Sequence, residues 1–138
     1  MELWRYHRDS FIRKASGLSD EDASRRFVGS ETTLLWLANH MAATQRNWIL
    51  NRFAGGSAPP LPPCDSIEDA LAACEENWRI IDTVIEQHDL DELCSRTVHG
   101  DSEPLNLRWV VVHLLEETAR HAGHADIIRE LVDGSTGR

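Results

Sequence analysis

Residues 104–134 read PLNLRWVVVHLLEETARHAGHADIIRELVDG, and apolar side chains recur in them at intervals of three and four residues. That spacing is typical of one face of an α-helix. Pro104 suits the first turn of a helix, and Gly134 suits the position just past its end. We therefore predict a long helix from about Leu105 to Asp133.

The inward face of this helix has a polar centre. At 100° per residue its apolar members are Val110, Leu114, Ile128 and Leu131. We place Glu117, His121 and His124 in the middle of the same face, and His113 lies at its edge. Buried carboxylates and imidazoles are costly unless they are paired or bind an ion. The folded protein must therefore supply partners for these side chains, either paired polar groups or a bound ion.

The N-terminal part of the chain predicts a helix and a short turn. The helix covers about residues 3–15 and ends before Gly17. In the polar segment that follows, Ser19 precedes Asp22 by three residues, a spacing that predicts a cap for one short helical turn.

A second long helix is predicted next. It starts after Ser30 or Thr32 and runs to Ala54, because the two glycines that follow favour a helix end. The sequence PPLPP at residues 59–63 cannot continue a helix and predicts a stiff, extended connector.

A third helix follows the connector. Asp65 or Ser66 caps it, and it reaches about His88. Alternation typical of strands is almost absent from the chain. Four helices in 138 residues predict an all-α four-helix bundle, and we expect residues 1–138 to form a single domain.

The composition argues against several classes of partner. Asp and Glu number 23 against 14 Lys and Arg, and the resulting net charge of −9 disfavours nucleic acids and acidic membranes. The apolar runs are too short for a membrane span and the first residues do not resemble a signal peptide, so we expect a soluble, cytoplasmic protein. The three cysteines form no CxxC pair, and we expect free thiols.

Glu117 and His121 are four residues apart on the last helix, so both can reach a single ion. His40 lies midway along the second helix, on the border of its inward face, at a matching depth. Three such ligands with a fourth position free for water or substrate are typical of a catalytic zinc-like site. The alternative is that His40 is a core histidine that hydrogen-bonds within the bundle.

Two other helical metal motifs are missing. A di-iron bundle needs Glu-x-x-His on two helices, but Glu117 is followed three residues later by Arg120. The HExxH motif of zinc proteases is also absent from the sequence.

Residues 107–134 resemble the last helix of the DinB-like, YfiT-like superfamily of metalloenzymes, and LANHM at residues 37–41, followed by Trp48, is similar to its second-helix motif. The resemblance covers nearly the whole chain and implies a variant of the up-and-down four-helix bundle. It also implies one divalent metal ion, commonly zinc or nickel, held by His40, Glu117 and His121. Glutamate followed by histidine on the last helix is the form of the mycothiol-dependent branch.

The resemblance further implies thiol-dependent chemistry. Relatives use mycothiol, bacillithiol or glutathione as cosubstrate, in S-transfer or in isomerisation of a small electrophilic molecule through a thiol adduct. No catalytic residue beyond the metal ligands is then needed. His124, His113 and Arg120 are expected to lie around the ligands or to contact substrate, and close relatives often carry an acidic residue in place of Gln45.

A second function remains open: a catalytically silent bundle that binds a metal or a small molecule. Trp36 and Trp109 fall off the inward faces of their helices. Outward aromatic side chains of this kind suit a homodimer interface.

Overall fold

The computed structural model describes residues 1–96 and 105–136. Within these ranges the only regular elements besides an isolated β-bridge between Leu93 and Asn106 are helices. In chain order they are α1 (Glu2–Ala15), α2 (Asp20–Ala23), α3 (Leu34–Arg46), the π-helix η1 (Asn47–Phe53), α4 (Ile67–Glu86) and α5 (Leu107–Asp133). The predicted all-α bundle is confirmed. None of these helices combines the length and hydrophobicity needed to cross a bilayer.

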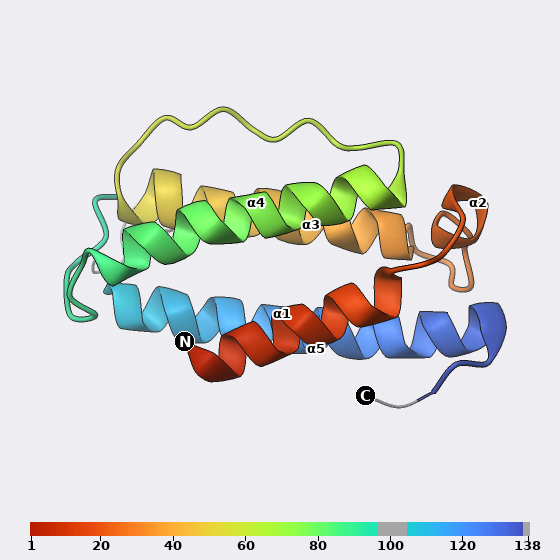
Figure 1. Ribbon diagram of the computed structural model, residues 1–138. Coiled ribbons are helices and arrows are strands. Elements are labelled where there is room, and N and C mark those ends of the chain that lie inside the picture. Colours follow the sequence, from red (N-terminus) through yellow and green to blue (C-terminus); the bar gives the residue numbers. More distant parts are fainter. Residues whose placement is uncertain (97–104, 137–138) are drawn as a thin grey trace.

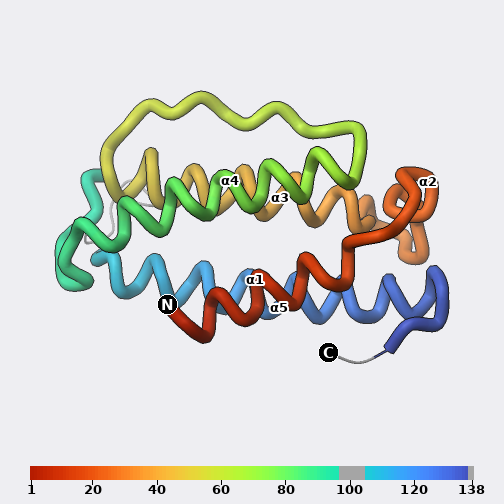
Figure 2. The backbone as a smooth tube through the Cα atoms, in the orientation of Figure 1, coloured from red at the N-terminus to blue at the C-terminus, as the bar shows by residue number. Residues whose placement is uncertain are grey.

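The four long helices form two pairs (Figure 1): α1 packs along α5, and α3 packs along α4. The segment between η1 and α4 returns along the length of the bundle, as the tube in Figure 2 shows, so α4 runs parallel to α3. The helix α5 runs in the opposite direction to α3. The helices α3 and α5 are also in contact, so an inward side chain of α3 can meet an inward side chain of α5.

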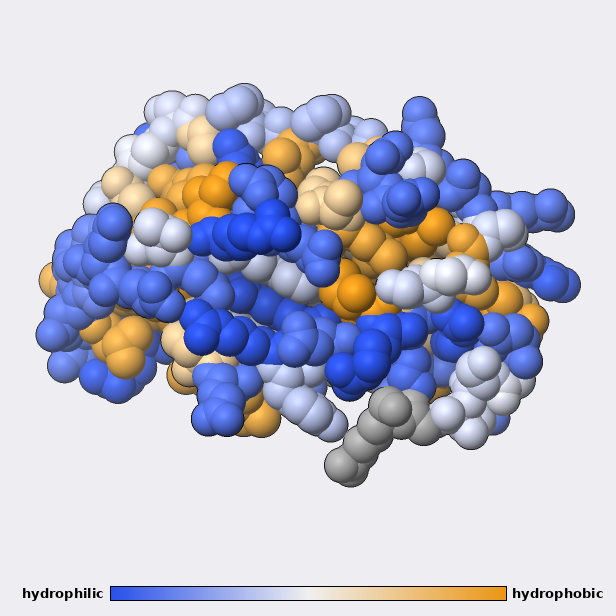
Figure 3. Space-filling view, in the orientation of Figure 1, coloured by the Kyte–Doolittle hydropathy of each residue, from blue (hydrophilic) through white to orange (hydrophobic). Residues whose placement is uncertain are grey.

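Polar groups separate two apolar cores. One core includes Phe11, Leu37 and Ile128, and the other includes Ile49 and Leu114. Along α3 and α5 the change from one core to the other falls at the buried polar residues Gln45 and Thr118 respectively. On the face of the molecule shown in Figure 3, hydrophilic side chains likewise lie between apolar patches.

Local chemistry explains where the helices begin and end. The Ser19 side chain accepts a hydrogen bond from the backbone of Asp22, as predicted, and Gly134 ends α5 in the left-handed conformation with φ 75°. Two predicted starts were too early. Thr33 caps α3, and Asn106 caps α5, because each side chain can accept the hydrogen bond of a backbone N–H in the first turn. Pro104 lies outside the described residues.

The helix predicted to run to Ala54 extends to Phe53 with Ala54 as its C-cap, but its last part is not α-helical. After Arg46 the chain continues as a π-helix, in which the N–H of Ala54 donates to the carbonyl of Ile49, five residues earlier. This wider turn brings residues five apart onto one face. Trp48 and Phe53 are five apart, and both are buried in the same core.

The inward face predicted for α5 was also wrong near its C-terminal end. Val110 is fully buried and Glu117 is partly exposed, but His124 is exposed and Leu131 is 53% exposed. These four residues are seven apart, and seven residues fall about 20° short of two full helical turns. The row therefore rotates out of the bundle along the helix.

Candidate metal centre

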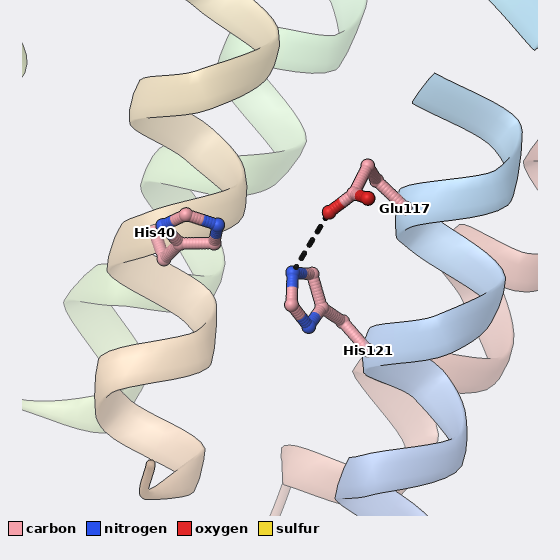
Figure 4. Close-up of side chains that lie close together, drawn as sticks. All are labelled: His40, Glu117 and His121. Carbon is pink, nitrogen blue, oxygen red and sulfur yellow. Dashed lines mark ion pairs between the residues drawn. The ribbon is translucent and has the colours of Figure 1, made fainter. Parts of the chain in front are cut away.

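His40, Glu117 and His121 come together between two antiparallel helices. His40 projects from α3, and Glu117 and His121 project toward it from α5 (Figure 4). One ligand atom from each residue can be chosen so that all three atoms lie within 4.8 Å of one another. The three predicted side chains therefore converge, and their role as metal ligands stays a prediction.

Helix geometry brings the acid and the imidazole of α5 together. Because they are four residues apart, Oε2 of Glu117 lies 3.5 Å from Nε2 of His121, the contact dashed in Figure 4. The His121 and His40 rings meet edge to face, with centroids 5.1 Å apart. At 3.5 Å the acid lies beside the imidazole without forming a hydrogen bond to it.

His121 is buried with both of its ring nitrogens unsatisfied. Neither Nδ1 nor Nε2 has a hydrogen-bond partner in the part of the chain that the structure describes. Burial is the main cause that lowers the pKa of His121 to about 4, and the neighbouring His40 lowers it further. Burial also lowers the pKa of His40. Both imidazoles are therefore neutral at pH 7, the form in which histidine binds a metal ion.

A small cavity lies at the cluster. Besides the three side chains, it is lined by Met41, Thr44, Gln45, Leu114 and Thr118. Its volume is about 10 Å³, which is close to the space that a single water molecule needs. An atom-sized group fits this cavity, whereas a substrate does not.

The floor of the cavity is a fixed hydrogen-bond network. Gln45 donates from Nε2 to Oγ1 of Thr118 at 3.1 Å and accepts at Oε1 from Nη2 of the buried Arg8 at 3.4 Å. Thr118 Oγ1 also accepts from the indole of Trp4 at 2.8 Å. Both ends of the Gln45 amide are thus engaged. At this position a neutral amide joins α3 to α1 and α5.

Arg120 contacts the cluster from outside. Its Nη1 lies 3.1 Å from Oε1 of Glu117, and its Nη2 donates to Oε1 of Glu116 at 3.2 Å. Since Oε1 of Glu117 faces Arg120, Oε2 is the oxygen that faces His121. Arg120 therefore orients the carboxylate.

The other two predicted histidines lie in different surroundings. His124 is exposed, and its ring centroid lies 5.6 Å from that of His121, at the edge of the cluster. His113 lies about one turn from Glu117 and two turns from His121, and its ring packs against Trp48 at 4.9 Å and Trp109 at 5.0 Å. The structure thus brings His124 to the cluster and places His113 in a separate aromatic group.

Trp36 also contacts the cluster, and this contact was not predicted from the sequence. Its ring stacks on His40, with centroids 4.6 Å apart. The sequence does contain a signal for this contact, because Trp36 precedes His40 by four residues and therefore lies one turn away on the same helix.

The helical bundle and its His, Glu, His cluster define a protein of the DinB-like class. A family model described as Mycothiol-S-transferase matches residues 2–134. The chain therefore belongs to the mycothiol-S-transferase family.

A solved structure supports the fold. It is described as the crystal structure of the conserved protein of locus from Enterococcus faecalis, and it aligns with a TM-score of 0.66 over 97% of this chain and 95% of that chain. Its sequence identity to this chain is 14%, so the likeness concerns the fold alone. No curated protein sequence matches the chain.

Proposed function

We propose that the protein is a divalent-metal-dependent thiol S-transferase or isomerase that acts on a small electrophilic substrate. Membership of the mycothiol-S-transferase family supports a thiol cosubstrate, of the mycothiol, bacillithiol or glutathione type. The observation that carries the proposal is the convergence of His40, Glu117 and His121, with ligand atoms within 4.8 Å of one another.

The residues present fit a metal ion. His121 has two buried nitrogens without a hydrogen-bond partner in the described chain, and the unprotonated nitrogen of a neutral imidazole can coordinate a metal ion. Two imidazoles and one carboxylate suit zinc or nickel and leave a coordination position free. A divalent ion held there lowers the pKa of a thiol that binds to it and so supplies a thiolate at neutral pH.

The chain's own residues prepare this site in three ways. The lowered pKa values of His40 and His121 keep both imidazoles in the neutral form at pH 7, with one ring nitrogen unprotonated. The ion pair with Arg120 turns one oxygen of Glu117 toward His121. His124 contacts a substrate that approaches from solvent, because it is exposed beside His121.

The two buried thiols of the protein stay out of the chemistry. Cys74 is fully buried, and burial raises the pKa of its thiol to about 12. Burial also raises the pKa of Cys94. Neither thiol forms an appreciable amount of thiolate at pH 7 to compete with a cosubstrate.

A second function is a bundle that binds a metal or a small molecule without turnover. The size of the cavity favours it, because about 10 Å³ holds an ion but leaves no room for a substrate beside the ligands. The transferase proposal therefore requires the substrate to bind on the outer side of the cluster.

Elemental analysis tests the metal centre. Protein purified without chelator should contain close to one equivalent of zinc or nickel, and His121→Ala should contain close to none. His7→Ala, on α1, is the control and should match the wild type. Absence of metal from both wild type and His121→Ala would refute the centre.

Turnover then separates the two functions. Metal-loaded protein is assayed with mycothiol, bacillithiol and glutathione against epoxides, maleyl compounds and halogenated aromatics. The transferase or isomerase proposal requires turnover that a chelator abolishes and added metal restores. Bound metal without turnover for any pair would favour the silent bundle.

We also propose that the chain forms a homodimer through the faces that carry Trp36 and Trp109. These indoles are 40% and 44% exposed. Light scattering coupled to size-exclusion chromatography should give a mass near twice 15.6 kDa, and a mass near 15.6 kDa would contradict the dimer.

A further inference from the structure

A larger pocket opens beside the candidate metal centre, on the side of the proline-rich connector. Its volume is about 480 Å³, and its polar lining comes from Thr44, Arg46, Asn47, Asn51 and Arg52. Thr44 also lines the small cavity at the His40 cluster, so one residue borders both spaces. The larger pocket therefore adjoins the cluster along α3 and η1.

The charge of this pocket is opposite to that of the chain. Two arginines line it and no acidic residue does, although the chain carries a net charge of −9. Most of the arginines that the structure describes form an ion pair, as Arg5 and Arg129 do. Arg46 and Arg52 form none with any carboxylate in residues 1–96 and 105–136. Two guanidinium groups thus face one pocket with their charge unpaired in the described chain.

The two arginines are held in place by contacts that leave their charge available. The Arg52 guanidinium lies over the ring of Trp48, with its carbon 4.4 Å from the ring centroid. Arg46 donates from Nε to the carbonyl of Pro59 at 3.3 Å. This bond uses one nitrogen and leaves both Nη groups for a ligand. Stacked or anchored guanidiniums lose less conformational entropy when they bind an anion.

The opposite wall of the pocket is fixed by Asn51. Its Oδ1 accepts from the backbone N–H of Ala58 at 2.7 Å, and its Nδ2 donates to the carbonyl of the same residue at 3.1 Å. These bonds hold the connector against η1. The π-helical turn contributes, because Arg46 and Asn51 are five residues apart and line the same pocket.

We propose that this pocket binds the carboxylate of a cosubstrate, with Arg46 and Arg52 as its ligands. The assignment of the pocket as a subsite rests on the proposed function. Arg46 lies six residues beyond His40, which is about 9 Å along the helix axis and about 120° around it. A molecule whose reactive atom is at the cluster would therefore carry its carboxylate at least about 9 Å away. A guanidinium can donate two parallel hydrogen bonds to the two oxygens of a carboxylate.

A binding experiment on the metal-free protein tests the pocket without using activity. The probe is succinate, and succinamide is its neutral analogue of the same shape. Succinate should shift the side-chain NMR signals of Arg46, Arg52 and Asn51, whereas succinamide should leave them unchanged. The double variant Arg46→Gln/Arg52→Gln should bind succinate at least about tenfold more weakly. The control Arg13→Gln, on the exposed face of α1, should bind as the wild type does.

Succinate shifts spread evenly over all arginines, or equal binding by the double variant, would overturn the proposal. If the double variant does not fold, Arg46→Gln alone is tested, because this side chain is partly exposed and contributes a single bond to the connector. It should weaken succinate binding at least about threefold, and Arg46→Lys, which keeps the charge, should recover part of the loss. Unchanged binding in Arg46→Gln would again overturn the proposal.

Kinetics on the metal-loaded enzyme then identify which cosubstrate supplies the carboxylate. Two matched pairs are compared: N-acetylcysteine with its amide, and 4-(chloromethyl)benzoate with its amide. The double variant should raise KM at least about tenfold for the carboxylate of one pair and change its amide little. An effect on the N-acetylcysteine pair would assign the carboxylate to the thiol, and an effect on the 4-(chloromethyl)benzoate pair would assign it to the electrophile. Equal effects on acid and amide in both pairs would contradict the subsite. If no pair gives turnover, the succinate experiment still shows whether the pocket binds a carboxylate. A failure of the proposed function can therefore be distinguished from a failure of the proposed subsite.

Discussion

The indole of Trp36 stacks on the imidazole of His40, with ring centroids 4.6 Å apart and ring planes 8° from parallel. The His40 ring is also nearly perpendicular to the His121 ring, at a centroid distance of 5.1 Å. The imidazole is thus packed against both a tryptophan and a second histidine. Packing fixes the plane of the ring before any ion arrives.

Removing this stack should weaken metal binding. In Trp36→Ala the His40 ring gains rotational freedom, which it loses again when it coordinates an ion. We expect the dissociation constant for zinc to rise on the order of tenfold, the lower end of the effect of residues that orient metal ligands. Competition with a chelating dye measures the affinity.

Trp109→Ala is a matched control. Trp109 is as exposed as Trp36, at 44% against 40%, and it also stacks on a histidine four residues along its helix, His113. Because His113 lies outside the cluster, this variant should bind zinc as the wild type does. Equal losses in both variants would show that general stability, rather than the orientation of His40, controls the affinity.

The cysteines should differ in their reactivity toward a disulfide reagent. Cys64 is partly exposed, whereas Cys74 is fully buried with its thiol pKa raised to about 12, and Cys94 is buried. At pH 8 the native chain should react rapidly at one thiol, and all three should react in urea. Cys64→Ser should remove the rapid phase. A rapid phase that persists in this variant would show that one of the buried thiols becomes accessible in the native protein.

The sequence predicted the features that depend on local chemistry. The cap at Ser19 and the helix end at Gly134 each depend on a few adjacent residues, so their positions could be read directly. The meeting of His40 with Glu117 and His121 was also predictable, because it requires only a helix face and a bundle. The cluster lies near the middle of α5, where the rotation of the face along the helix is still small.

Features that accumulate along a helix, or that join distant helices, could not be predicted in this way. The rotation that exposes His124 and Leu131 grows with each heptad. The π-helical turn after Arg46 depends on burying both Trp48 and Phe53, which is known only once the bundle has closed. The hydrogen bond from Arg8 to Gln45 joins residues 37 apart in the sequence, and no spacing of residues in the sequence predicts it.

The metal-free protein should lose stability as the pH falls from about 6.5 to 4. Burial lowers the pKa of His121 from 6.5 to about 4, so over this interval the unfolded chain binds a proton there and the folded chain does not. The free energy of unfolding therefore decreases as the pH decreases, and the contribution of His121 is fully present only above pH 6.5. It amounts to about 3 kcal/mol.

Denaturation with urea in the presence of chelator measures this contribution at each pH. Carboxylates also titrate below pH 5, so the informative quantity is the difference between the wild type and His121→Gln. The variant should lose less stability than the wild type between pH 6.5 and 4. Parallel pH profiles for the two proteins would show that His121 is not protected from protonation in the folded state.

Two arginines that share one carboxylate should differ in their contribution to stability. Arg8 Nη1 lies 2.7 Å from one oxygen of Asp82, and Arg5 Nε lies 3.1 Å from the other. The Arg8 side chain is 2% exposed and its guanidinium lies 3.7 Å from the Trp4 ring centroid, whereas the Arg5 side chain is 49% exposed. Removing a buried partner costs more than removing a solvated one, because the remaining groups cannot turn to water.

We expect Arg8→Ala to lower the free energy of unfolding by about 3 kcal/mol, the lower end for a broken buried ion pair because Arg5 still contacts Asp82. Arg5→Ala should leave the urea midpoint almost unchanged. Arg8→Ala should also weaken zinc binding, since Gln45 loses its bond to Arg8 and lines the cavity at the cluster. A stability loss with unchanged zinc affinity would mean that this network supports the bundle without acting on the centre. Equal midpoints for the two variants would contradict the buried role of Arg8 altogether.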